Sequence, residues 1–143
     1  ILDIADLRNR IEIIQKLKVG NKSSNLINII SRYTKLANKG NLENDKYTCE
    51  DKINIELFEK KSEIDVFNFL QKLENLLNTK DWEYHQLINL FQKNTQILFE
   101  IFDNNNGVLV MTEDLKLRNN RLNLLALVRN YSLLIADFTL LNS

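Results

Sequence analysis

The residues best suited to chemistry lie near the carboxyl end, where arginine and asparagine cluster in LKLRNNRLN at residues 115–123. Guanidinium and ammonium groups bind phosphate oxygens, and arginine and asparagine can also read the base edges of single-stranded RNA. A second group, on a predicted helix in the first third, adds a tyrosine that could stack on an exposed base. The candidates for binding a polyanion are Arg32, Tyr33, Lys35, Lys39, Lys116, Arg118, Asn120 and Arg121.

The same residues also have a structural explanation. Arg121 could pair with Asp103 across the preceding loop, or with Asp137 from a neighbouring turn. The basic residues of the first third could simply solvate two surface helices. The pattern by itself leaves the structural and the binding explanations open.

Residues that could carry catalysis are scarce. The single histidine, His85, lies on a predicted helix, and no second histidine completes a metal pair. The single cysteine, Cys49, lies in an acidic connection where no basic neighbour would lower its thiol pKa. No glycine-rich phosphate loop is present. We therefore expect no catalytic residue, no metal site and no cofactor-binding residue in this chain.

Composition indicates one helical domain spanning residues 1–143. Hydrophobic residues make up 44%, proline is absent and glycine occurs three times, which favours long helices. The 19 basic residues balance 19 acidic ones, but residues 8–39 hold eight basic residues and one acid. Such asymmetry can orient a polyanion on one face of a neutral domain. No apolar run is long enough to span a membrane, and a single cysteine suits a reducing, cytoplasmic compartment. The start without methionine suggests a piece of a longer protein.

Apolar residues at helical spacing predict an all-α bundle of about five helices. An irregular connection at residues 41–56 should be attached to the bundle by Leu42, Tyr47 and Ile53, with a short helical turn at 57–58. We expect helices at residues 2–19, from 23 or 24 to 40, 62–78 and 82–102, and a last helix after Thr112.

Side-chain chemistry predicts how these helices begin, end and pack. Gly20 would end the first helix, whose apolar face holds Ile4, Leu7, Ile11 and Ile14. The predicted caps are Ser23 or Ser24 for the second helix, Ser62 with Asp65 for the third, and Thr112 for the last, with Glu113 and Asp114 in its first turn.

The last predicted helix has two apolar stripes, which is typical of a helix at the centre of a bundle. One long edge between them carries arginine and asparagine side chains. Ahead of it, the apolar run Val108–Met111 follows an asparagine–glycine turn. We expect this run to be an extended connector, packed on the bundle, that positions the Arg/Asn cluster.

These features resemble the carboxyl-terminal end of the beta subunit of bacterial-type glycyl-tRNA synthetase. The family pattern has Phe-Phe-Asp, a V-x-V-M run, an acidic pair, L-R-x-N-R-L, a Leu pair, an arginine and a closing A-D-[IF]-x-L-L. The matching residues here are Phe102-Asp103, Val108–Met111, Glu113-Asp114, Leu117–Leu122, Leu124-Leu125, Arg129 and Ala136–Leu141. Upstream agreement is looser; Arg32 matches a family arginine, whereas Ser31 and Lys35 replace a lysine and an asparagine.

The resemblance implies an all-helical, DALR-type anticodon-binding domain. It implies that the domain grips the anticodon arm of tRNA(Gly), while the alpha subunit of an α2β2 assembly carries the class II active site that uses ATP and Mg²⁺. The tRNA-binding residues would be Arg32, Lys35, Arg118, Asn120 and Arg121. The competing hypothesis is a helical scaffold that binds a protein partner through an apolar stripe; an independent enzyme has no set of residues to support it.

Overall fold

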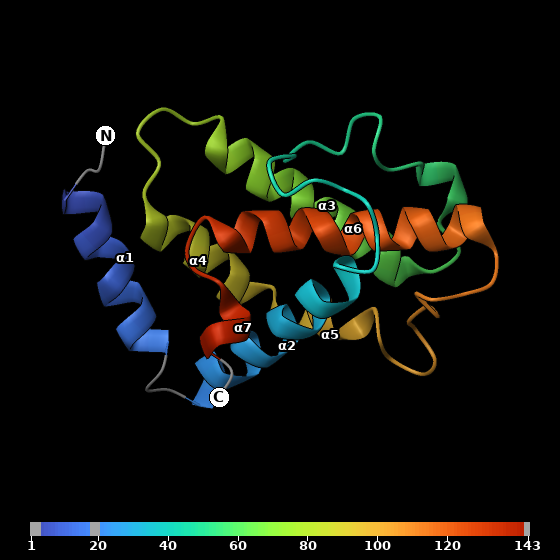
Figure 1. The fold of residues 1–143 in the computed structure, drawn as a ribbon, viewed down its shortest axis with the longest axis horizontal. Helices are drawn as coiled ribbons and strands as arrows, with labels where there is room; N and C mark the ends of the chain where they lie inside the picture. Colours follow the sequence, from blue (N-terminus) through green and yellow to red (C-terminus); the bar gives the residue numbers. More distant parts are fainter. Residues whose placement is uncertain (1–3, 18–20, 142–143) are drawn as a thin grey trace.

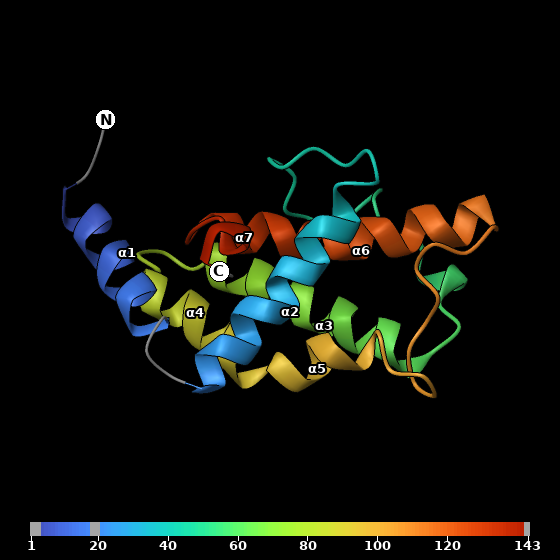
Figure 2. The same ribbon diagram turned by 60° about the horizontal axis from the view of Figure 1, so that its bottom comes forward.

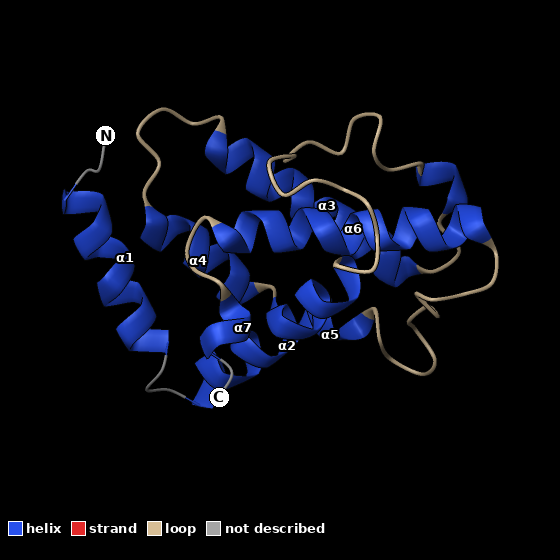
Figure 3. Cartoon of the chain, viewed as in Figure 1, coloured by secondary structure: helices blue, strands red, loops and turns tan. Residues whose placement is uncertain are grey.

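The computed structural model describes residues 4–17 and 21–141, and this part of the chain contains helices and no strand (Figures 1 and 3). Five of its helices have ten residues or more. The predicted all-α bundle is therefore confirmed, while the predicted helix end at Gly20 and cap at Ser23 fall outside the described residues and side chains. The elements are α1 (Ile4–Leu17), α2 (Asn21–Ala37), the 3-10 turn η1 (Ile55–Leu57), α3 (Lys61–Leu77), α4 (Tyr84–Lys93), α5 (Thr95–Glu100), α6 (Leu115–Leu133) and α7 (Phe138–Leu141).

The last long helix, α6, runs through the middle of the bundle. Figures 1 and 2 show α2 crossing it on one side and α3 on another, and both helices pack against it. Because α6 has neighbours on several sides, almost every side chain from Asn120 to Ser132 is buried. The prediction that two apolar stripes indicate a central helix is confirmed.

The irregular connection between α2 and η1 is held by polar side chains of α6. Leu42, Tyr47 and Ile53 pack against the core as predicted. A backbone that forms no regular ladder still needs hydrogen-bond partners where it is buried, and α6 supplies them as side-chain donors to backbone carbonyls. The bonds, at 2.6–2.9 Å, run from Asn123 to Lys52, from Arg129 to Leu42, from Asn130 to Glu43 and Lys46, and from Tyr131 to Tyr47.

The start of α3 differs from the prediction. The Glu63 carboxylate Oε1 accepts hydrogen bonds from the backbone N–H groups of Glu59 and Lys60, at 2.8 and 3.1 Å. The predicted pair, Ser62 and Asp65, lies inside the helix instead. The sequence KKSEID offers several capping residues in a row, and only the tertiary position of the preceding chain selects one of them.

The starts of α2 and α6 also differ. The α6 cap is Asp114, whose Oδ1 accepts from the backbone N–H groups of Lys116 and Leu117 at 3.0 and 3.2 Å. The prediction of Thr112 as the cap was therefore two residues early. Ser24 lies within α2, so it does not cap that helix.

The helix predicted at residues 82–102 is interrupted at Asn94. The Asn94 amide donates to the Leu90 carbonyl at 2.8 Å, and the Thr95 hydroxyl donates to the carbonyls of Phe91 and Gln92 at 3.1 and 3.0 Å. Side chains that bond carbonyls of the preceding turn compete with the helical backbone ladder. The segment therefore forms two helices, α4 and α5, which can follow the curve of the bundle.

The apolar face predicted for α1 is largely exposed. Ile4, Leu7 and Ile11 are 69, 38 and 45% exposed, whereas Ile13 and Leu17 are buried. The helix lies at the edge of the bundle and packs against α4 and α2 (Figure 1). The predicted helix is present. A helical repeat reveals an apolar face, but it does not show whether a neighbour covers that face, and here most of the face is left uncovered.

The side chain of Asn130 should be essential for the order of the connection. We expect Asn130→Ala to lower the free energy of unfolding by about 2 kcal/mol or more, because it leaves the buried carbonyls of Glu43 and Lys46 without a donor. Urea denaturation would measure the loss. The control is Asn119→Ala on the exposed side of the same helix, and equal denaturation midpoints for the two variants would contradict the prediction.

The thiol of Cys49 should be unreactive until the chain unfolds. Burial, and after it the nearby Glu74 carboxylate, raise its pKa to about 11, against the opposing effect of a hydrogen bond with Gln71. Since the ordinary value is 9.0, the unfolded thiol ionises first and the free energy of unfolding should fall as pH rises from 9 toward 11. Thiol labelling at pH 8 should be fast only in denaturant; equally fast labelling of the folded chain would refute this.

Candidate functional site

The exposed face of α2 carries a polar stripe without acidic residues. Asn25, Asn28, Arg32 and Lys35 are exposed and recur every three or four residues, so they share one side of the helix. Lys39 follows just past the helix end and is exposed as well. The sequence of α2 contains no aspartate or glutamate, so this stripe presents positive charge and amide groups to solvent.

Arg32 lies over an aromatic ring. Its guanidinium carbon is 4.0 Å from the centroid of the Phe102 ring, a cation–π contact. The rings of Phe102 and Tyr33 pack edge to face, with centroids 5.3 Å apart and an angle of 76° between their planes, and the Tyr33 hydroxyl donates to the Leu98 carbonyl at 2.7 Å. Burial raises the pKa of Tyr33 well above its ordinary value, so the hydroxyl stays protonated and able to donate. Arg32 therefore rests on a fixed aromatic pair.

Asn120 and Arg121, on α6, point inward. Asn120 Oδ1 accepts from the backbone N–H of Asn54 at 2.7 Å, and its Nδ2 donates to the Asn54 carbonyl at 3.0 Å. Arg121 is 4% exposed; its Nη1 donates to the Leu109 carbonyl at 2.8 Å and its Nη2 to the Glu59 carboxylate at 2.6 Å. The two side chains join α6 to the segments on either side of it.

The structural partners suggested for Arg121 were the wrong ones. Its carboxylate neighbours are Glu59 and the fully buried Glu63, whose Oε2 lies 3.6 Å from the guanidinium Nε. The Asp103 carboxylate instead accepts from the backbone N–H groups of Asn105 and Asn106, at 3.0 and 2.8 Å, and these bonds lower its pKa. Asp103 thus stabilises its own turn.

Arg118, by contrast, is available for a ligand. It is half-buried, and its side chain forms no hydrogen bond or ion pair within residues 4–17 and 21–141. The predicted cluster therefore falls into two groups. The inward group, Asn120 and Arg121, bonds other parts of the protein, and the outward group is Lys116 and Arg118. The helical repeat places Arg118 and Arg121 on one long edge of α6, together with other arginine and asparagine side chains, but it does not show which of them a neighbouring segment covers.

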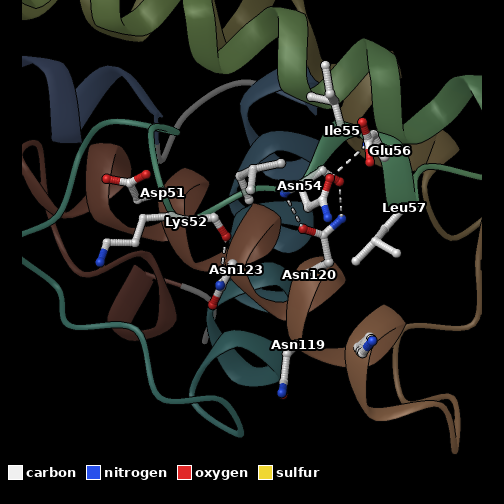
Figure 4. Close-up of a pocket in the computed structure, with 11 residues that line it drawn as sticks. Asp51, Lys52, Asn54, Ile55, Glu56, Leu57, Asn119, Asn120 and Asn123 are labelled. Atoms are coloured by element: carbon white, nitrogen blue, oxygen red, sulfur yellow. Dashed lines mark hydrogen bonds between the residues drawn. The ribbon is translucent and has the colours of Figure 1, made fainter.

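A pocket of about 730 Å³ lies beside the outward group, between α6 and the segment that contains η1 (Figure 4). Asn120 and Asn123 reach up to this segment and bond its backbone. The side chain of Asn119 points away from it and is exposed. Lys116 also lines the pocket, together with the exposed Ile55.

A second pocket, of about 390 Å³, lies between α2 and the loop at residues 103–111. Arg32 and Phe102 line one side, and the loop lines the other. Because Arg121 holds the Leu109 carbonyl of that loop, the α6 residue supports a wall of the pocket that Arg32 faces. Sequence reasoning missed Phe102 as the partner of Arg32, since a contact over 70 positions leaves no local pattern.

The single histidine and the single cysteine line neither of these two pockets. His85 is exposed, and its Nδ1 lies 3.0 Å from the Glu83 carboxylate. Cys49 is buried and free. Residues 4–17 and 21–141 contain no cluster of histidine, cysteine and acidic side chains arranged to bind a metal. Within the same ranges, no helix is long and apolar enough to cross a membrane.

Replacing Arg121 should destabilise the fold rather than remove a surface charge. We expect Arg121→Met to lower the free energy of unfolding by about 3–5 kcal/mol, since it strands the buried Glu63 carboxylate. The double variant Arg121→Met with Glu63→Gln should recover part of this loss. Thermal unfolding of Arg118→Met, which breaks no ion pair, provides the control; an equal loss for Arg118→Met would show that Arg121 has no special structural role.

Comparison of the sequence with those of known proteins places the chain in a family. No family model matches the chain. The glycine–tRNA ligase beta subunit of Gloeothece citriformis is 34% identical over 138 residues, and that of Trichodesmium erythraeum is 33% identical over 138 residues. Each match covers 95% of this chain but 19% of the relative, at its carboxyl-terminal end. The same subunit of Synechocystis sp. is 33% identical over 140 residues, with the same coverage. The chain therefore spans about a fifth of these relatives and belongs to the glycine–tRNA ligase beta-subunit family, as the counterpart of their carboxyl-terminal domain.

Proposed function

We propose that this chain is a tRNA-binding domain that grips the anticodon arm of tRNA(Gly). The observation that carries the proposal is the exposed, acid-free stripe on α2, in a chain related to beta subunits of a tRNA ligase. Lys35, Lys39 and Arg118 form no ion pair within the described residues. Cations without internal partners can exchange their counterions for phosphates, which is the main source of affinity for nucleic acids.

The five predicted site residues have two different roles in this proposal. Arg32, Lys35 and Arg118 are the RNA contacts, because their charged groups have no ion-pair partner among the described residues. Asn120 and Arg121 position the loops on either side of α6, because their polar atoms are already bonded within the protein. Direct contact between RNA and the amide of Asn120 would require that side chain to release Asn54.

The wider assignment follows the family and is part of the proposal. The domain would support ATP-dependent attachment of glycine to tRNA(Gly) in the cytoplasm without contributing a catalytic residue or binding a cofactor itself. An alpha subunit, in an α2β2 assembly, would carry the class II active site with ATP and Mg²⁺. This domain would position the tRNA, through phosphate contacts that do not depend on the RNA sequence and base contacts that do.

A second candidate function rests on the exposed apolar side chains of α1. Ile4, Leu7 and Ile11 could bind a protein partner instead of RNA. Such a contact would depend weakly on salt, whereas RNA binding through several phosphates weakens steeply as salt rises. Salt dependence therefore separates the two functions.

Neutralising Arg32, Lys35 and Arg118 should weaken tRNA binding. We expect Arg32→Gln, Lys35→Gln and Arg118→Gln together to reduce the slope of log K against log salt by about 2–3, since each lost phosphate contact removes about 0.7–0.9. Filter binding of tRNA(Gly) at several salt concentrations would measure this, with Lys72→Gln on α3 as a control and an anticodon-swapped tRNA as the test of specificity. A salt-independent affinity of the unmodified chain would contradict the proposal.

A further inference from the structure

One face of the Arg32 guanidinium packs on the Phe102 ring, and the other face is open. The guanidinium carbon lies 4.0 Å from the centroid of the Phe102 ring, and Tyr33 packs edge to face with Phe102. Within the described residues, the Arg32 side chain forms no hydrogen bond or ion pair. An arginine that is already held in place loses little conformational freedom when a ligand stacks on its open face.

The opposite wall of this pocket is a fixed loop. Gly107 N–H donates to the Asp103 carbonyl at 3.0 Å, and Val108 N–H donates to the Ile101 carbonyl at 2.9 Å. A Cβ atom at Gly107 would lie 2.4 Å from the Ile101 oxygen, so the turn requires glycine. These contacts close the turn between Asp103 and Val108, and the bond from Arg121 attaches the following residue, Leu109, to α6.

The fixed loop presents apolar side chains that the protein itself leaves uncovered. Leu109 is 71% exposed and Met111 is 38% exposed, and both line the pocket with Leu36 and Val108. Exposed apolar side chains beside a planar guanidinium suit a ligand with a flat apolar face. The pocket volume of about 390 Å³ falls in the range of about 300–1,000 Å³ that is usual for sites of small ligand groups.

The charges around the pocket favour a nucleotide over an apolar peptide. Lys35 lies one helical turn beyond Arg32, and Lys39 lies just past the end of the same helix. The one carboxylate lining the pocket, Asp103, is engaged by the backbone N–H groups of its own turn. Unpaired bases of RNA loops stack on guanidinium planes, and the adjoining phosphates would meet the two lysines.

We propose that this pocket receives one unpaired base of the bound RNA loop, stacked on the open face of Arg32 and bordered by Leu109 and Met111. The inference rests on the proposed function and adds a base-binding subsite to it. Arg32 then contributes a planar stacking surface as well as a positive charge, while Phe102 and Tyr33 position its guanidinium.

The test separates the plane of Arg32 from its charge. Arg32→Lys keeps the charge and removes the plane, so we expect affinity for the anticodon stem-loop of tRNA(Gly) to fall about five- to 150-fold with an unchanged salt slope. Leu109→Ala, at an exposed position, should also weaken binding. Arg8→Lys, an exposed substitution on α1, is the matched control and should change affinity less than about twofold; circular dichroism verifies that each variant is folded.

A set of abasic RNAs then identifies the stacked base. Each loop nucleotide is replaced in turn by an abasic one, and the penalties of Arg32→Lys and Leu109→Ala are measured again on each RNA. At one position both penalties should nearly vanish, because the base that needs the plane is absent. If the penalties persist at every position, the subsite is wrong while salt-dependent RNA binding still stands. If the unmodified chain shows no salt-dependent binding of the stem-loop, the proposed function fails and the subsite fails with it.

Discussion

The fold depends on one helix whose buried polar side chains replace the missing hydrogen-bond partners of irregular backbone. Along α6, polar residues are interspersed among the apolar ones that form the core, and most of both kinds are buried. Leaving a buried carbonyl without a donor costs about 1–3 kcal/mol, so a long connection can lie against the bundle only if something bonds it. Asn123, Arg129, Asn130 and Tyr131 do this for the connection between α2 and η1.

Arg129 illustrates how costly this arrangement is and why it is stable. The residue is 6% exposed and has no carboxylate partner among the described residues; it donates to the Asn38 and Asn130 side chains and to the Leu42 carbonyl. Desolvation lowers its pKa from the ordinary arginine value, in the direction expected for a buried cation. The charge is tolerated because neutral oxygen acceptors surround it. The hydrogen bond from Arg129 to Leu42 therefore both holds the connection between α2 and η1 and helps to stabilise the buried charge.

The same constraint links the fold to the proposed RNA surface. Arg121 is bonded to the loop that forms a wall beside Arg32, and Asn120 is bonded to the segment that closes the pocket of Figure 4. Arg121 and Asn120 are of residue types that often contact RNA, but here they are bonded inside the protein. They hold segments that line the two pockets. The cations without internal ion pairs lie on the outer face of α2 and at Arg118, where the proposal places the phosphate contacts.

The sequence alone determined the helical class, the central place of the last helix and the attachment of the connection by Leu42, Tyr47 and Ile53. These follow from periodicity and burial tendency, which are local properties of the chain. It also carried the family resemblance that the comparisons support. Only the tertiary structure decided which side chain caps a helix, whether the apolar face of α1 is covered, and which way each α6 residue points.

The physical reason is distance along the chain. Arg121 meets Glu59 across 62 positions, and Asn120 meets Asn54 across 66. A helical repeat places residues on a face within a few turns, but the partner of that face depends on how separate helices pack. The residue types alone show that guanidinium and amide groups are present on α6. The packing of α2, α3 and two loops around that helix decided which of these groups form internal hydrogen bonds and which do not.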